Sequence, residues 1–337
     1  MKFTVSLKSL FLFFLSSLTI GSTKAYGAAG LPDLSEVKNH SACKLDVESC
    51  KAEYPISNAQ FPFYISKGQG KIDKVIIVIH GTDRNATDYL RDFITSNDSE
   101  TTLANTLVIA PHFLQVDDQH SAQELSWVHA WENSWKFGAK SESPAAVNSY
   151  AVIDQLVKSA DISLHPKKII VMGHSAGGQF VQRYAYGSQV RKGIQSSLTY
   201  VVSNPSSYLY MHDERWLDNK WIQPLVQSCP DYNLYIYGPK GRNDYFAGLS
   251  DSKMESNYLQ NNVFYLMGTN DVLTEDLDQS CGANLQGVNR ITRAKNFFQY
   301  LNSYYPGQTH QFLMVEGVGH DHVKMFSSEE FLKILNK

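Results

Sequence analysis

Residues 173–178 read Gly-His-Ser-Ala-Gly-Gly and lie between a short apolar run over residues 168–172 and a helical pattern over residues 179–186. A chain that passes directly from a buried strand into a helix must turn sharply. The glycines on both sides of Ser175 leave room for that turn, because they carry no Cβ. The sequence therefore predicts a strand, a tight turn with the Ser175 hydroxyl above the strand end, and a helix.

Short, continuous runs of β-branched residues recur along the chain and predict strands buried on both faces. They cover residues 75–79, 107–110, 169–172, 199–202, 263–267 and 312–315, and an earlier strand is predicted over residues 61–66. Helical patterns cover residues 145–159, 179–186, 290–304 and 328–336. Residues 28–62, up to the first strand, are polar and predict an irregular surface segment. The alternation of strands and helices predicts an α/β fold with a mostly parallel central sheet and helices on both faces.

Two long stretches interrupt this alternation. Residues 206–261 are rich in Tyr and Trp, and they predict a lid-like insertion within one domain that spans residues 26–337. In the other stretch, Trp127, Trp131 and Trp135 are spaced like one face of a helix. We expect this tryptophan stripe to pack in the core, with substrate stacking as the alternative.

The N-terminal residues have the features of an export signal. Positive charge precedes a short apolar run over residues 10–20, and a small residue follows at Ala25. The run is shorter than the ~20 apolar residues of a membrane-spanning helix, which disfavours the alternative of a retained anchor. We predict a signal peptide over residues 1–25, with Gly27 and Ala29 as alternative cleavage sites, and a secreted or periplasmic mature protein without stable membrane insertion.

Export changes the reading of the cysteines, because disulfides form in oxidising compartments. Four remain in the mature chain, namely Cys43, Cys50, Cys229 and Cys281. Four cysteines allow three pairings. Closeness in sequence favours Cys43–Cys50, which leaves Cys229–Cys281, and four buried thiols are the alternative.

Ser175 requires a base to take its proton and an acid to orient that base. When a serine lies on a strand–turn–helix of this kind, the acid and then the histidine follow it in the chain, each beyond a later strand. Asp271 follows the predicted strand over residues 263–267, and His320 follows the one over residues 312–315. The sequence therefore predicts Ser175 as nucleophile, Asp271 as acid and His320 as base. Asp276 and Asp278 are rival acids, and His322 is the rival base.

Such a site also needs hydrogen-bond donors for a developing oxyanion. The first donor should be the backbone N–H of Ala176, directly after the nucleophile, and the second should come from the loop after an early strand. The strand over residues 75–79 leads into His-Gly-Thr-Asp. We predict the Thr82 N–H as the second donor, with the Asp83 N–H as the alternative.

The segment Gly173 to Gly177, together with Asp271 and His320, resembles the α/β-hydrolase superfamily over nearly the whole mature chain. More particular stretches resemble secreted hydrolases of the polyhydroxybutyrate-depolymerase-like or feruloyl-esterase-like kind. They are His80-Gly81 with Arg84-Asn85-Ala86, Cys281 with Gln286-Gly287 and Asn289-Arg290, and the run from Gly317 to Asp321. The resemblance implies an α/β-hydrolase fold and hydrolysis of ester bonds.

Other functional classes lack support in the sequence. The net charge of -3 gives no electrostatic reason for nucleic-acid binding. Residues 173–178 lack the Lys-Ser/Thr pair of a phosphate-binding loop, and no dinucleotide fingerprint follows the first strand. His320 and His322 flank Asp321, but residues this close on one turn rarely converge on a metal. We expect neither a metal nor a cofactor.

The sequence thus predicts a secreted serine hydrolase that cleaves carboxylic esters, small or polymeric, through an acyl-enzyme on Ser175. A peptidase, an amidase or an acyltransferase with the same three residues is the alternative within this chemistry. A non-catalytic binding protein on the same scaffold is the alternative outside it.

Overall fold

The computed structural model of the chain describes residues 30–97, 102–129 and 134–337. The predicted signal peptide over residues 1–25 and its cleavage sites lie outside the described residues, and so does Trp131.

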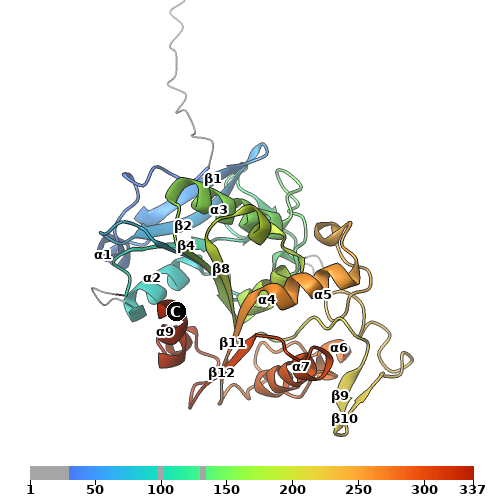
Figure 1. Cartoon of the computed structure of the whole chain (residues 1–337). Helices are drawn as coiled ribbons and strands as arrows, with labels where there is room; N and C mark the ends of the chain where they lie inside the picture. Colours follow the sequence, from blue (N-terminus) through green and yellow to red (C-terminus); the bar gives the residue numbers. More distant parts are fainter. Residues whose placement is uncertain (1–29, 98–101, 130–133) are drawn as a thin grey trace, which may run out of the picture.

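An eight-stranded sheet crosses the centre of the molecule (Figure 1). From one edge to the other its strands are β1 (Lys51–Ile56), β2 (Ala59–Lys67), β4 (Thr106–Pro111), β3 (Lys74–Ile79), β7 (Lys168–His174), β8 (Ser197–Ser203), β11 (Asn262–Gly268) and β12 (Gln311–Val315). The pairs β1–β2 and β2–β4 are antiparallel, whereas all neighbours from β4 to β12 are parallel. The predicted mostly parallel sheet is confirmed.

Both faces of this sheet are apolar and covered by helices. In β3, Val75 and Ile77 belong to one hydrophobic cluster and Ile76 and Val78 to another, because successive side chains of a strand point to opposite faces. The first cluster includes residues of α3 (Ser149–Leu164), α4 (Ala176–Gly187) and α7 (Arg290–Tyr304), and the second includes residues of α2 (Ala86–Asn97), α8 (His322–Phe326) and α9 (Glu329–Asn336). This is the three-layer arrangement that the alternation of elements predicts.

Shorter elements lie in the connections. They are α1 (His40–Leu45), η1 (Glu48–Cys50), β5 (Leu114–Gln115), β6 (Ser126–Trp127), η2 (Trp135–Phe137), η3 (Val190–Gly193), β9 (Arg215–Leu217), β10 (Lys220–Ile222), η4 (Asp244–Phe246), α5 (Asp251–Gln260) and α6 (Cys281–Asn284), where η marks a 3-10 helix.

Each of the seven predicted strands falls within a strand of the sheet. The prediction that residues 28–62 are irregular is wrong, because this segment contains α1, η1, β1 and the start of β2. β1 is an edge strand that contains Pro55 and leaves Lys51 and Glu53 exposed, so it lacks the continuous apolar run of a buried strand.

The tryptophan stripe is not on one helix, so that part of its interpretation is wrong. Trp127 ends the short strand β6, and Trp135 begins η2. Both rings are buried, and Phe113 packs against them at centroid distances of 5.3 Å and 5.1 Å. For these two tryptophans, core packing is the observed role.

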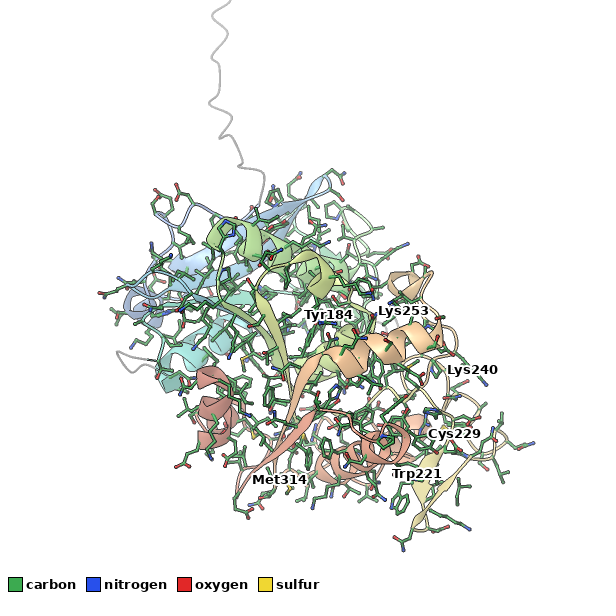
Figure 2. All side chains as sticks on the ribbon, viewed as in Figure 1. Tyr184, Trp221, Cys229, Lys240, Lys253 and Met314 are labelled. Carbon is green, nitrogen blue, oxygen red and sulfur yellow. A yellow bond between two sulfur atoms is a disulfide. The ribbon has the colours of Figure 1, made fainter. Side chains whose placement is uncertain are left out.

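Residues 206–261, predicted as an insertion, connect β8 to β11. The hairpin β9–β10 stands at the edge of the molecule, and Figure 2 labels Trp221 on it and Cys229 in the loop that follows. The end of the segment, α5, packs on α4, where the Tyr258 ring stacks on Tyr186 at 3.6 Å. The segment therefore contains both a peripheral hairpin and a helix of the main α/β layer.

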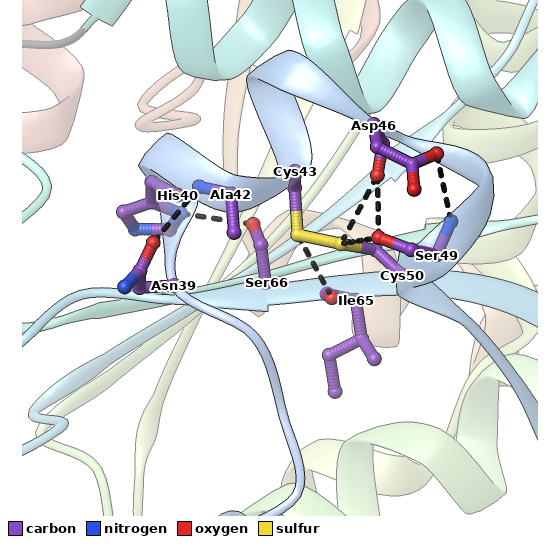
Figure 3. Close-up of a disulfide and its surroundings, with 9 residues drawn as sticks. All are labelled: Asn39, His40, Ala42, Cys43, Asp46, Ser49, Cys50, Ile65 and Ser66. Atoms are coloured by element: carbon purple, nitrogen blue, oxygen red, sulfur yellow. Dashed lines mark hydrogen bonds between the residues drawn. A yellow bond between two sulfur atoms is a disulfide. The ribbon is translucent and has the colours of Figure 1, made fainter.

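Both predicted disulfides are present. Cys43–Cys50 joins α1 to η1 beside Ile65 of β2 (Figure 3), and Cys229–Cys281 joins the loop after β10 to the first residue of α6. Within the described residues no cysteine is free.

Among the helices that the structure describes, none has both the length and the apolar character needed to cross a bilayer.

The two disulfides should differ in their contribution to stability, because they close loops of different length. Cys43–Cys50 spans 7 residues and Cys229–Cys281 spans 52. Loop-closure entropy then gives about 2 kcal/mol for the first and about 4 kcal/mol for the second. We expect the double variant C229S/C281S to lose more free energy of unfolding than C43S/C50S, measured by urea denaturation. An equal loss, or a larger loss in C43S/C50S, would contradict this expectation.

Candidate active site

Ser175 occupies the tight turn between β7 and α4. Its backbone has φ 57° and ψ -118°, a conformation that is sterically costly for a residue with a side chain. A Cβ on Gly173 would collide with the backbone of Gly177, and one on Gly177 would collide with the carbonyl of Ile79. The Ser175 N–H donates to the carbonyl oxygen of Ser203 at 3.0 Å. The predicted strand–turn–helix is therefore present, and both flanking positions require glycine.

Asp271 and His320 meet at the ends of two neighbouring parallel strands. Asp271 follows β11, His320 follows β12, and the His320 Nδ1–H donates to Asp271 Oδ2 at 2.8 Å. The Asp271 side chain is fully buried, whereas the His320 side chain is 24% exposed. A buried carboxylate that accepts this hydrogen bond fixes the orientation of the ring and leaves Nε2 as the nitrogen free to act as a base.

The rival residues have other partners. Asp278 accepts a hydrogen bond from the Tyr237 hydroxyl at 2.7 Å. The His322 Nε2–H donates to Asp92 Oδ2 at 3.0 Å, and the His322 ring stacks on Tyr89. Asp276 lies in the exposed part of the same loop as Asp271, and among the described residues no hydrogen bond or ion pair joins it to His320. The structure thus joins Asp271 to His320 and separates the rivals from this pair.

Arg290 contacts the second oxygen of Asp271, a contact that the sequence did not reveal. Its Nη1 lies 3.5 Å from Asp271 Oδ1, and both side chains are fully buried. The guanidinium also donates to the carbonyl oxygens of Leu273 and Glu275 at 3.3 Å and 2.8 Å. Burial lowers the pKa of Arg290, and the nearby Asp271 carboxylate opposes that shift. Arg290 therefore fixes the acid and the loop that follows it.

The structure records no hydrogen bond between the Ser175 hydroxyl and the His320 ring, both of which lie in the described part of the chain. His320 nevertheless packs against the residue that directly precedes Ser175. His174, directly before Ser175, has its ring centroid 4.5 Å from that of His320. Catalytic hydrogen bonds are often long in the absence of a substrate and shorten when one binds.

The two residues predicted to supply oxyanion donors belong to chain segments at Ser175. Ala176 is the first residue of α4, where a backbone N–H has no acceptor within the helix. Gly81 lies beside Ser175, since a Cβ on Gly81 would be 3.9 Å from the Ser175 Cβ. Thr82 follows Gly81 and is exposed, and its N–H makes no hydrogen bond among the described residues.

His80 controls the direction of the Gly81–Thr82 peptide. The His80 Nδ1–H donates to the Gly81 carbonyl at 2.9 Å, and His80 Nε2 accepts from the Phe113 N–H at 3.1 Å. Burial lowers the pKa of His80 to about 3, so the ring is neutral, as these two bonds require. Because N–H and C=O of a trans peptide point in opposite directions, fixing the Gly81 carbonyl also fixes the Thr82 N–H.

No group of three His, Cys, Asp or Glu side chains in the described ranges is arranged to hold a metal ion.

Comparison with solved protein structures identifies the fold of this chain. No protein-family model and no curated protein matches the chain. LpqC, a poly(3-hydroxybutyrate) depolymerase from Bordetella parapertussis, has a similar solved structure, with a TM-score of 0.58 and 20% identity over 90% of this chain and 100% of that one. Poly(aspartic acid) hydrolase-1 from Sphingomonas sp. KT-1 gives a TM-score of 0.59 and 19% identity over 85% and 98%. The chain has the α/β-hydrolase fold, as the sequence resemblance implies.

Buried histidines should make the fold sensitive to acid. Burial lowers the pKa of His80 to about 3, that of His310 to about 4, and that of His174 well below its usual value. An unfolded histidine takes up its proton near pH 6.5, so acid favours the unfolded chain. We expect the free energy of unfolding to fall between pH 6.5 and pH 4, by about 1.4 kcal/mol per pH unit for each such histidine.

The variant His310→Gln isolates one of these histidines. The His310 Nε2–H donates to the Tyr258 carbonyl at 2.8 Å, and a glutamine amide can make the same bond without titrating. Its free energy of unfolding should depend less steeply on pH than that of the wild type. Identical slopes for the two proteins would refute the role of His310.

Proposed function

We propose that this protein is a secreted serine hydrolase that cleaves carboxylic ester bonds through an acyl-enzyme on Ser175. The observation that carries the proposal is the 2.8 Å hydrogen bond from His320 to the buried Asp271, next to a serine on a strained turn. The α/β-hydrolase fold supports it, because similar folds carry nucleophile, acid and base at the corresponding strand ends. Two disulfides support a secreted or periplasmic location.

In the first half-reaction Ser175 Oγ attacks the ester carbonyl carbon while His320 Nε2 takes the hydroxyl proton. A bond forms between Oγ and carbon, and the carbonyl π electrons move to oxygen. Asp271 stabilises the imidazolium through the Nδ1–H bond, and the N–H groups of Ala176 and Thr82 donate to the oxyanion. The tetrahedral intermediate then collapses, and the alcohol leaves with the proton from His320.

In the second half-reaction His320 takes a proton from water, and the resulting hydroxide attacks the acyl-enzyme carbonyl. The same donors hold the second oxyanion. Collapse breaks the bond to Ser175 Oγ, which recovers its proton from His320, and the carboxylic acid leaves. No step requires a cofactor.

The proposed substrate is a carboxylic ester, small or polymeric. The two similar structures are named for hydrolysis of poly(3-hydroxybutyrate) and poly(aspartic acid), which supports a polymeric substrate.

Substitution of the nucleophile tests the proposal. We expect the wild type to hydrolyse p-nitrophenyl butyrate and to acquire one fluorophosphonate adduct, which peptide mass spectrometry should locate on Ser175. Ser175→Ala should lose the adduct and at least about 10⁵-fold in kcat. Ser252→Ala changes an exposed serine of α5 and serves as the matched control. This variant should keep the adduct on Ser175 and the kcat of the wild type. An adduct on another residue, or full activity in Ser175→Ala, would refute the proposal.

A further inference from the structure

Asn204 is a buried amide that contacts the last residues of two strands, β7 and β11, and the loop after β12. It directly follows β8, has φ 44°, and is fully buried. Its Oδ1 accepts a hydrogen bond from the Gly268 N–H at 3.0 Å, and its Nδ2 donates to the Gly319 carbonyl at 3.2 Å. The same Nδ2 lies 3.4 Å from His174 Nε2. Both hydrogens and the oxygen of the amide are therefore engaged.

The partners fix which way this amide points. A backbone N–H at Gly268 can only donate, and a carbonyl at Gly319 can only accept, so oxygen and nitrogen of Asn204 cannot be exchanged. The Nδ2–H then faces His174 Nε2, which must accept. His174 is consequently neutral with its proton on Nδ1, and that nitrogen lies 3.3 Å from the Tyr89 hydroxyl. Burial, which lowers the pKa of His174, favours the same neutral form.

Each of these partners lies within three residues of a proposed catalytic residue in the chain. Gly319 precedes His320, Gly268 lies three residues before Asp271, and His174 precedes Ser175. The His174 ring is also packed against the His320 ring, with 4.5 Å between their centroids. The Asn204 amide thus contacts the chain next to each of the three proposed catalytic residues.

We propose that Asn204 is a positioning residue that holds the His320 loop in place relative to Ser175 and keeps the neighbouring His174 uncharged. This inference rests on the serine-hydrolase function proposed above. The Gly319 carbonyl is the last backbone group before the base, so releasing it lets the imidazole move relative to the serine. Displacements of about 1 Å between reacting groups can reduce a rate by about 100-fold.

The variant Asn204→Asp replaces the amide donor with a second acceptor oxygen and adds a negative charge, and Asn261→Asp makes the same exchange elsewhere in the fold. Aspartate has nearly the size of asparagine, tolerates a positive φ, and keeps an oxygen for the Gly268 N–H. It places a second oxygen against the Gly319 carbonyl, where the donor had been. With p-nitrophenyl butyrate we expect kcat to fall about 10- to 100-fold while KM changes by less than about threefold.

Asn261→Asp is the matched control. Asn261 is also buried and also donates its amide to a backbone carbonyl, that of Ala185 at 2.8 Å. It lies directly before β11, at the strand end away from the site. The exchange should lower the melting temperature about as much as Asn204→Asp does and leave kcat within about twofold of the wild type. General destabilisation would therefore lower the melting temperature of both variants. Loss of positioning would lower kcat in Asn204→Asp alone.

Asn204→Gly provides a second variant in case the aspartate does not fold. Glycine adopts a positive φ without strain and lacks the amide, so the same loss in kcat is expected. If folded Asn204→Asp or Asn204→Gly retains kcat within about twofold of Asn261→Asp, the positioning role is refuted. If instead the wild type neither hydrolyses the ester nor forms the Ser175 adduct, the proposed function itself is refuted.

Discussion

Four neighbouring strands, β7, β8, β11 and β12, run parallel and end at the same edge of the sheet. Ser175, Asn204, Asp271 and His320 follow these ends in chain order. The register aligns His174 with Ser203 and Gly268 with Val315, so the four loops emerge side by side. Open α/β sheets bind ligands at the carboxyl ends of their strands for this reason. The geometry of the proposed site therefore depends on the register in which these strands pair, within a sheet that helices cover on both faces.

Buried arginines stabilise the irregular chain around this edge. Arg183, Arg215 and Arg293 are fully buried, and burial lowers their pKa values. Arg183 donates to the carbonyl of Ser207, and Arg293 donates to that of Ser206. Arg215 donates to the carbonyls of Tyr232 and Tyr237, which lie in the same connection between β8 and β11. Carbonyls of irregular chain have no partner strand, and leaving them unpaired in the interior is costly. The arginines supply the missing donors and allow a long connection to pack against the α/β layers.

The sequence predicted seven of the eight strands of the sheet and placed Asp271 and His320 after two of them, because continuous apolar runs are a local signal. The strands β3 and β7 are continuous apolar runs, and Asp271 and His320 each follow such a run. Other features leave no local signal. β1 is a half-exposed edge strand, and the roles of His80 and Asn204 depend on backbone groups up to 115 residues away in the chain. Such contacts are defined only once the strands are in register.

In the proposed mechanism the His320 imidazole, oriented by Asp271, takes the proton of the Ser175 hydroxyl. A crystal structure of the protein after reaction with a fluorophosphonate tests this role most directly. We expect a phosphorus–Oγ bond on Ser175, His320 Nε2 within about 3 Å of that oxygen, and a phosphonyl oxygen that accepts from the N–H groups of Ala176 and Thr82. An adduct on another side chain, or an imidazole more than about 4 Å from Oγ, would contradict it.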